Sequence, residues 1–124
     1  DFREAMSRLG AAVNVVTTCG DAGLCGYTGT AVCSLSADPA SMIVCLNTES
    51  EMNAVFSANK TICINVLSAH QEHLSAQFAG QCNVEMRDRF SPDEWISLSS
   101  GTPALREALC VLDGEIDQIV EYEK

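Results

Sequence analysis

The residues best suited to bind a ligand lie between Gly26 and Asn47, in the stretch GYTGTAVCSLSADPASMIVCLN. Threonine, serine and asparagine are spread there among small apolar residues, and Asp38 is the only charged side chain. Residues two apart in a strand face the same side of a sheet. One face is therefore predicted to carry Thr28, Thr30, Val32 and Ser34, and the other Gly29, Ala31, Cys33 and Leu35.

Two interpretations of this stretch remain open. The first is a structural hairpin of the core, because alternating threonine and valine are common in half-buried strands. The second is a cradle for a flat ligand with polar edges, since small residues let backbone amides and carbonyls approach a ring. Asn47 and Ser50 precede an expected helix, whose first free N–H groups could hold a phosphate.

Other chemistry has less support. His70 and His73 lie three residues apart without a third metal ligand nearby, so two surface histidines are the simpler interpretation. Arg87 or Arg89 could hold a nucleotide phosphate or belong to a solvated turn. The sequence contains no G-x-G-x-x-G, G-x-S-x-G or H-E-x-x-H pattern, which excludes a Rossmann dinucleotide site and the common hydrolase signatures.

Composition and charge exclude further classes of protein. The 124 residues, 47% of them hydrophobic, suit one folded domain. A net charge of −10 argues against nucleic acid and anionic membranes as partners. The seven cysteines show no C-x-x-C spacing. We expect them to be free thiols in a cytoplasmic protein, with Cys33 and Cys45 buried.

The elements that must position the candidate residues are mainly strands. Strands are expected over residues 11–18, 24–35, 42–47 and 61–67, because these runs are rich in β-branched and apolar residues. Short helices are expected over residues 1–10, with Asp1 as N-cap, and over residues 50–60, with Ser50 as N-cap. The pattern Ser68–Gln71 predicts a capping box that opens a further helix, which Gly80 ends.

The C-terminal third is less regular. Residues 81–103 are expected to be mostly irregular, with Phe90 and Trp95 as packing anchors. Residues 108–124 are predicted to form one long strand, or a hairpin broken near Asp113 and Gly114.

Three segments together resemble a known family. In order and spacing, FREAMSRLGAAVNVVTT, GDAGLCGYTGTAVCSLSADPASMIVCLN and INVLSAHQEHLSAQFAG are similar to the short-chain flavin reductases. These are the small reductase components of two-component flavin-dependent monooxygenases. The resemblance covers nearly the whole chain. It does not separate the reductases of 4-hydroxyphenylacetate 3-monooxygenase from those of pyrimidine utilisation.

This resemblance implies a mainly β (α+β) fold, a split β-barrel of the FMN-binding type with short inserted helices, as one domain over residues 1–124. It implies a homodimer that passes hydride from NADH or NADPH to FMN or FAD and releases reduced flavin to a separate oxygenase. A non-catalytic flavin-binding protein of the same fold is the alternative. No catalytic side chain and no metal are expected. The family's flavin motif falls here on Thr28, Thr30, Ala31, Val32, Cys33 and Ser34, followed by Asn47 and Ser50.

The sequence departs from the family pattern at three places. Gly29 stands where the family usually has alanine, and DPAS replaces a Pro-Pro turn. The family also continues with several strand-forming residues and a histidine-containing tail beyond the position of Lys124. We therefore expect the barrel formed by this sequence to be incomplete at the C-terminus.

Overall fold

The structure is a computed structural model, and it describes residues 1–80 and 85–122. The fold is mixed and mostly β-sheet, with short helices. In chain order its elements are α1 (Phe2–Met6), β1 (Asn14–Thr18), β2 (Cys25–Gly29), β3 (Val32–Ala37), β4 (Ala40–Val44), α2 (Met52–Asn59), β5 (Thr61–Val66), the 3-10 turn η1 (Ala69–Gln71), α3 (Glu72–Phe78), the 3-10 turn η2 (Met86–Arg89), β6 (Trp95–Ser97), β7 (Pro103–Leu105) and β8 (Cys110–Glu115).

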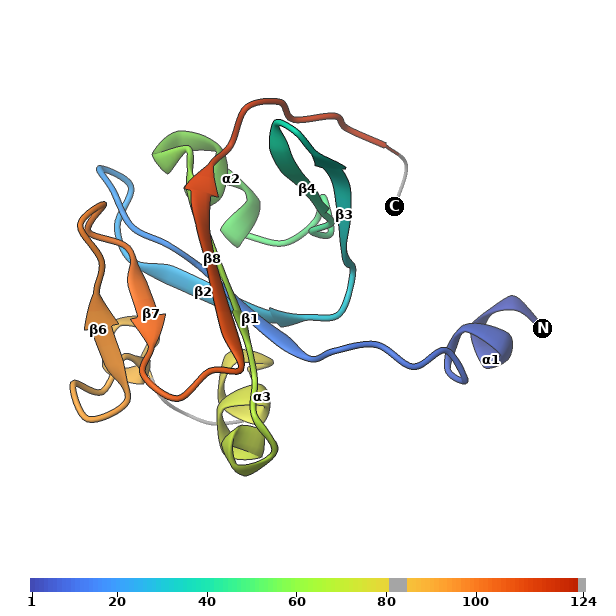
Figure 1. Cartoon of the computed structure of the whole chain (residues 1–124), viewed down its shortest axis with the longest axis horizontal. Helices are drawn as coiled ribbons and strands as arrows, with labels where there is room; N and C mark the ends of the chain where they lie inside the picture. The colour runs from blue at the N-terminus through green and yellow to red at the C-terminus, as the bar shows by residue number, and fades with distance from the viewer. Residues whose placement is uncertain (81–84, 123–124) are drawn as a thin grey trace.

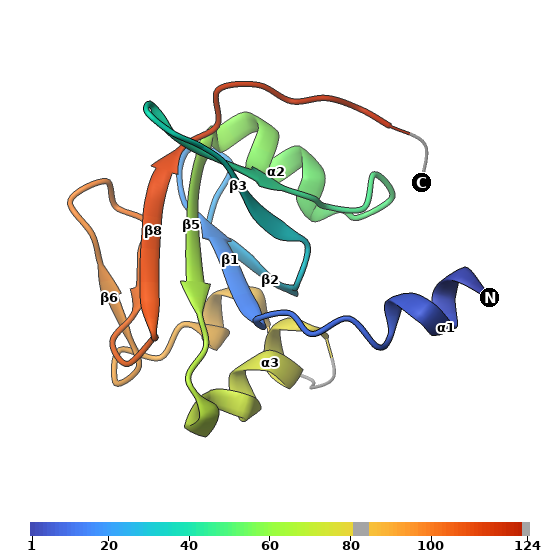
Figure 2. The same cartoon turned by 45° about the vertical axis from the view of Figure 1, so that its right-hand side comes forward.

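The centre of the molecule is a four-stranded antiparallel sheet in the order β2-β1-β5-β8 (Figures 1 and 2; β5 is labelled in Figure 2). Val16 of β1 lies opposite Tyr27 of β2 on one side and Ile64 of β5 on the other. Two hairpins, β3–β4 and β6–β7, form separate two-stranded sheets. Within the described ranges the strands do not close into a barrel, because β2 and β8 end the central sheet without pairing to each other.

Alternation along β1 divides the core between the two faces of this sheet. Val15 packs on one face in a buried cluster that also contains Leu74, Phe78, Trp95 and Leu105. Val16 packs on the other face in a second cluster, with Cys25, Tyr27, Phe56 and Ile64. The helix α3 and the β6–β7 hairpin thus cover one face, and α2 with the β3–β4 hairpin lies over the other (Figure 2).

Buried polar groups fix the hairpin β6–β7 to the central sheet. The Thr17 hydroxyl donates to the Pro103 carbonyl over 2.9 Å. The Asn65 side chain donates to the Val15 carbonyl over 2.9 Å and accepts from the Leu105 N–H over 3.0 Å. Buried polar groups of this kind are costly without partners, so these bonds specify where the hairpin docks.

Several local predictions are confirmed. Asp1 caps α1 by accepting from the Glu4 N–H over 3.0 Å. The Gln71 side chain accepts from the Ser68 N–H over 3.0 Å, as the capping-box pattern requires. Gly80 adopts a positive φ of 78° just after α3, a conformation that favours glycine. The two expected anchors, Phe90 and Trp95, pack edge-to-face with ring centroids 4.8 Å apart.

The prediction of one strand over residues 24–35 is wrong. The chain turns at Thr30, whose carbonyl accepts from the Val32 N–H over 2.9 Å. The Ala31 carbonyl then accepts from the Cys45 N–H over 3.0 Å. This bond begins the pairing of the β3–β4 hairpin. β2 and β3 therefore belong to different sheets.

The C-terminal third is more regular than expected. Residues 95–105 contain the β6–β7 hairpin, whose strands of three residues are too short to give a clear sequence pattern. Residues 81–84 lie outside the described ranges. β8 is a single strand that pairs with β5 through Asp113 and Gly114, so the alternative of a hairpin broken there is wrong. The alternative of one long strand over residues 108–124 is also wrong, because β8 ends at Glu115.

Candidate functional site

A groove of about 340 Å³ opens between the β3–β4 hairpin and the central sheet. Its walls include Asn14 and Ile64 from the sheet and Thr30, Val32 and Met42 from the hairpin side. The mostly apolar lining with a few polar groups, and a volume near the lower end of the usual range for ligand pockets, make this groove a candidate binding site.

The register of the hairpin decides which β3 side chains face the groove. Ser34 pairs with Met42, which lines the groove, whereas Cys33 pairs with Ile43. Paired residues share a face of the sheet. Val32 and Ser34 therefore lie on the groove side of the hairpin, and Cys33 lies on its outer side, as the alternation within this strand predicts.

Thr28 does not share that face, and this part of the prediction is wrong. The Thr28 hydroxyl donates to the Ser75 carbonyl of α3 over 2.7 Å. The Thr28 side chain therefore lies on the face of the central sheet that α3 covers. The physical reason is the turn at Thr30 and Ala31, which separates Thr28 from Val32 and Ser34 by a change of sheet.

The hydroxyls of Thr30 and Ser34 are free to bind a ligand within the described structure. Both residues are exposed, and neither side chain makes a hydrogen bond to another described residue. The interpretation of this stretch as a core hairpin holds only in part: β2 is largely buried and Val32 packs on the core, whereas five of the six residues of β3 are exposed.

Asn47 and Ser50 build the turn before α2. The Asn47 side chain accepts from the Glu49 N–H over 2.8 Å, and the Ser50 hydroxyl accepts from the Met52 N–H over 3.2 Å. Helix α2 begins at Met52 with Glu51 in the N-cap position, one residue later than predicted. The turn thus uses some of the N–H groups expected to be free, and the two exposed carboxylates of Glu49 and Glu51 flank it.

Free thiols are confirmed for the cysteines that the structure describes, namely Cys19, Cys25, Cys33, Cys45, Cys63 and Cys110. Cys82 lies outside the described ranges. The expectation that Cys33 and Cys45 are buried is wrong, because both are exposed on the two-stranded hairpin. Below them, the Tyr27 hydroxyl donates to the Cys45 carbonyl over 3.3 Å. Burial raises the pKa of Tyr27, which keeps this phenol a neutral donor.

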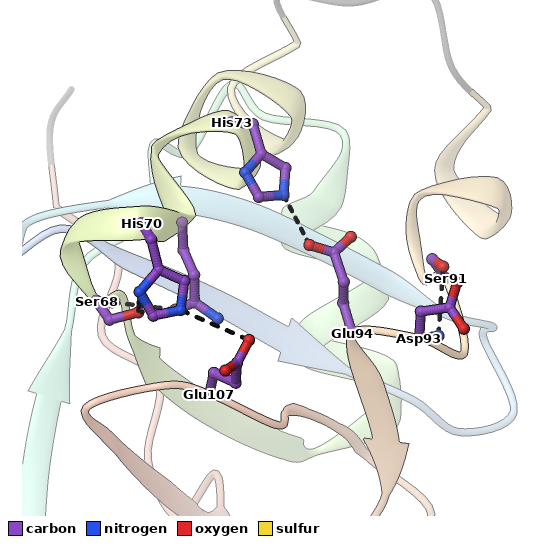
Figure 3. Close-up of polar contacts among 8 residues, drawn as sticks. Ser68, His70, His73, Ser91, Asp93, Glu94 and Glu107 are labelled. Atoms are coloured by element: carbon purple, nitrogen blue, oxygen red, sulfur yellow. Dashed lines mark hydrogen bonds and ion pairs between the residues drawn. The ribbon is translucent and has the colours of Figure 1, made fainter.

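The two histidines are exposed, as expected, and each contacts a carboxylate (Figure 3). His73 Nε2 lies 2.7 Å from Glu94 Oε2, and His70 Nε2 lies 3.5 Å from Glu107 Oε2. Sequence spacing could not reveal these pairs, because the carboxylates come from the β6–β7 region. No group of three or more potential metal ligands occurs among residues 1–80 and 85–122.

The arginines proposed from sequence lie in η2, where Arg87 is exposed and Arg89 is half-buried. Neither belongs to the lining of the groove. In the described part of the chain, none of the helices is long and apolar enough to span a membrane.

A small β-rich domain with an open, hydroxyl-edged groove is the class of protein that this fold and site define. Residues 6–124 match the family model of the flavin reductase like domain. The chain therefore belongs to this family, as the sequence resemblance indicated.

Curated relatives represent both groups recognised from the sequence. The chain is 48% identical over 118 residues to the 4-hydroxyphenylacetate 3-monooxygenase reductase component of Salmonella typhimurium, covering 95% of this chain and 69% of that protein. It is 46% identical over 120 residues to the FMN reductase (NADH) RutF of Serratia proteamaculans, covering 97% of this chain and 67% of that protein.

Solved structures of flavin reductases share the fold. The NADH:FAD oxidoreductase SgcE6 of Streptomyces globisporus C-1027 matches with a TM-score of 0.86 at 26% identity, covering 98% of this chain and 71% of that one. The flavin reductase PheA2 matches with a TM-score of 0.84 at 28% identity, covering 98% and 75%. SgcE6 is also known in complex with NAD and FAD fragments.

Proposed function

We propose that this chain is an NADH- or NADPH-dependent flavin reductase that supplies reduced FMN or FAD to a separate monooxygenase. The names of the relatives, a monooxygenase reductase component and an FMN reductase (NADH), support this activity. The structural observation that carries the proposal is the groove beside β3, where the exposed hydroxyl of Thr30 edges an apolar wall and Ser34 lies on the same face of the hairpin as the groove-lining Met42.

The residues present fit a flavin ring in this groove. Val32, Met42 and Ile64 offer an apolar surface, and the Thr30 hydroxyl can donate to or accept from the polar edges of a ring. Ser34, which pairs with Met42 on the same face of the hairpin, can do so beside the groove. Asn14 lines the groove, but its side chain amide already donates to the Gly29 carbonyl over 3.1 Å. Asn14 therefore shapes the groove more than it binds a ligand.

The eight residues proposed from sequence then act in different ways. Thr30, Val32 and Ser34 would contact the flavin directly, and Ala31 would lie at the turn where the backbone can approach it. Thr28 would hold β2 against α3, and Cys33 would lie behind the contacting residues. Asn47 and Ser50 would shape the turn that receives the phosphate. Two carboxylates flank this turn, so it suits a phosphate less well than the groove suits the flavin ring.

When bound, the flavin supplies the hydride acceptor, so the chemistry itself needs no protein nucleophile. The chain's part is to orient the ring and to exclude water from one of its faces. The lining residues of the groove are all uncharged, which suits this positioning role.

We further propose that residues 1–124 form one flavin reductase domain and that the three sheets are the frame of a split β-barrel. The fold of the flavin reductase structures that this chain matches supports this architecture. We propose a homodimer, because the exposed apolar hairpin offers a surface for a second copy. A cytoplasmic location is supported by the six described free thiols, which are typical of a reducing compartment.

Steady-state oxidation of NADH and NADPH, each with FMN and with FAD, tests the activity. The expected result is nicotinamide oxidation that depends on added flavin and exceeds the rate without protein. A protein that binds flavin but does not oxidise either nicotinamide would support the non-catalytic alternative. Absence of both binding and oxidation would contradict the proposal as a whole.

A charge introduced at Ser50 tests the phosphate turn separately. Ser50→Asp keeps an acceptor for the Met52 N–H but places a negative charge near a bound phosphate. We expect FMN binding to weaken by about 1–3 kcal/mol, measured by fluorescence titration. Ser50→Asn is the matched control, because asparagine also caps a helix but adds no charge. Equal dissociation constants for the two variants would place the phosphate elsewhere.

A further inference from the structure

The N-terminal segment extends away from the rest of the molecule and carries α1 with it (Figures 1 and 2). Phe2, Met6 and Leu9 recur at helical spacing and are 80%, 46% and 64% exposed. The hydrogen bonds described for residues 1–9 all stay within this segment. Isolated helices shorter than about 12–15 residues are marginal in water, so a five-residue helix requires a packing partner.

The outer side of the β3–β4 hairpin is a second apolar surface that no described residue covers. Cys33 and Ile43 are paired there, and Leu35 lies at the irregularity that follows. Ile43 is 44% exposed and Leu35 is 65% exposed. The groove lies on the opposite side of the hairpin, so a protein that covers this outer side leaves the groove accessible.

Charge makes these two surfaces compatible with each other. The whole chain carries a net charge of −10, so two copies repel each other over most of their surface. Residues 1–10 contain two acidic and two basic side chains, and the stretch from Gly26 to Asn47 contains only Asp38. The arm and the hairpin are therefore exposed parts of the chain through which two copies can meet with little repulsion.

We propose that two copies of this chain exchange their N-terminal arms. Phe2, Met6 and Leu9 of one copy pack on the outer side of the hairpin of the other copy, against Cys33, Leu35 and Ile43. The arm and the hairpin lie on the same side of the central sheet in both views (Figures 1 and 2). A two-fold axis on that side makes both contacts at once and closes the dimer.

The exchange of arms also affects one wall of the groove. Gly10, Ala11 and Ala12 line it, and they connect the arm to β1. When a second copy holds α1, these connecting residues lose their freedom, and one wall of the groove becomes fixed. This inference rests on the proposed dimer and the proposed flavin site, but not on catalysis.

Sedimentation of the whole protein at several concentrations tests the exchange. Met6→Lys and Ile43→Asp each place a charge in one of the two apolar surfaces, and both positions are exposed in a single copy. Each variant is expected to raise the dissociation constant of the dimer by about tenfold or more. Ser7→Lys and Ala40→Asp are the matched controls, because they add the same charges at exposed positions outside the two surfaces.

A mixture of the two variants distinguishes exchange from an arm that folds onto its own hairpin. A Met6→Lys chain and an Ile43→Asp chain can form one unchanged contact and one Lys–Asp contact. The mixture is expected to sediment as a dimer at a concentration at which each variant alone is monomeric. A mixture that stays monomeric overturns the exchange, and so does a wild-type protein that forms no dimer.

Nicotinamide oxidation by the same samples separates this inference from the proposed function. Flavin-dependent turnover by a wild-type monomer would overturn the exchange and leave the reductase activity standing. Wild-type dimers that exchange arms but show no turnover would leave the inference standing and contradict the activity. Tighter flavin binding by dimers than by dissociated variants is expected, because the exchange fixes a wall of the groove.

Discussion

The strands β1 and β3 have similar sequences and opposite surroundings. NVVTT in β1 and VCSLSA in β3 both mix hydroxyl side chains with apolar ones. All five residues of β1 are buried, whereas five of the six residues of β3 are exposed. The hydroxyl of Thr17 in β1 is bonded to a neighbouring hairpin, but the hydroxyl of Ser34 in β3 bonds to no described residue.

This difference shows that residue type alone does not say whether a hydroxyl is structural or free to bind a ligand. β1 lies between β2 and β5 and is covered on both faces. β3 has one strand partner, and one of its faces borders a groove. The position of a strand in the sheet decides the role of its polar side chains.

Thiol reactivity should show the largest contrast between the two regions. Cys63 lies opposite Thr17 in the central sheet, where burial and the nearby Asp113 carboxylate raise its pKa from 9.0 to about 12. At pH 8 its reactive thiolate is then roughly a thousandfold rarer than that of an ordinary cysteine. We expect iodoacetamide to modify exposed Cys33 and to leave Cys63 intact, as peptide mass mapping measures.

The pH dependence of that contrast has a definite sign. Because the folded pKa of Cys63 is raised, its contribution to stability is complete below pH 9.0 and is lost as the pH rises toward about 12. Cys63→Ala is the control, and its stability should fall less steeply over this range. Equal modification of both thiols in the native protein at pH 8 would contradict the described burial.

Side-chain truncation should show the next largest difference. Val15→Ala removes two methyl groups from a fully buried position, and we expect it to lower the free energy of unfolding by about 2–3 kcal/mol. Leu35→Ala removes more atoms but from an exposed side chain, so the change should stay within about 0.5 kcal/mol. Urea unfolding at a dilution at which the protein is monomeric measures both. A larger loss for Leu35→Ala would reverse the comparison.

Removing one hydroxyl from each strand gives a smaller contrast in stability. Thr17→Val leaves the buried Pro103 carbonyl without its donor and should cost about 1–3 kcal/mol. Ser34→Ala removes a hydroxyl that faces solvent, so its stability should match that of the wild type within about 0.5 kcal/mol. Thermal unfolding of both variants would reveal whether the Thr17 bond has this value.

The smallest expected effect is on flavin binding, for which β3 should matter more than β1, the reverse of their effects on stability. Ser34→Ala should weaken binding by about 0.5–1.5 kcal/mol, because one hydrogen bond to the ligand is lost. Ser97→Ala is the matched control, since Ser97 is an exposed strand serine of β6 outside the groove. Isothermal titration with FMN compares the two. An unchanged affinity in Ser34→Ala would remove this residue from the proposed site.

Much of the fold could be predicted from the sequence because the signals are local. The capping residue Asp1, the box formed by Ser68 and Gln71, and Gly80 each depend on a few neighbouring residues. Strand positions followed from β-branched runs, although β1 begins three residues later than expected and β8 ends at Glu115, well before the expected end of its strand. The β6–β7 hairpin was missed, because three-residue strands leave no periodic pattern.

The candidate site could be predicted only in part. Thr30, Val32 and Ser34 were proposed as binding residues from their types and the family motif, and the register confirms only that Val32 and Ser34 share a face. Thr28 has the same residue type and spacing, yet it is bonded to α3. Nothing within residues 28–34 specifies this, because the turn at Thr30 is fixed by a partner strand more than ten residues away.

The sequence by itself determined the class of fold, the family and the neutral, hydroxyl-rich segment that any ligand site would use. These properties depend on residue type and short-range order, which the sequence states directly. Only the tertiary structure decided that β1 is buried, that β3 borders a groove and that the N-terminal arm stands apart from the body. Burial depends on which distant segments pack together. Two strands of similar alternating composition do not reveal from their own residues which segments will cover them.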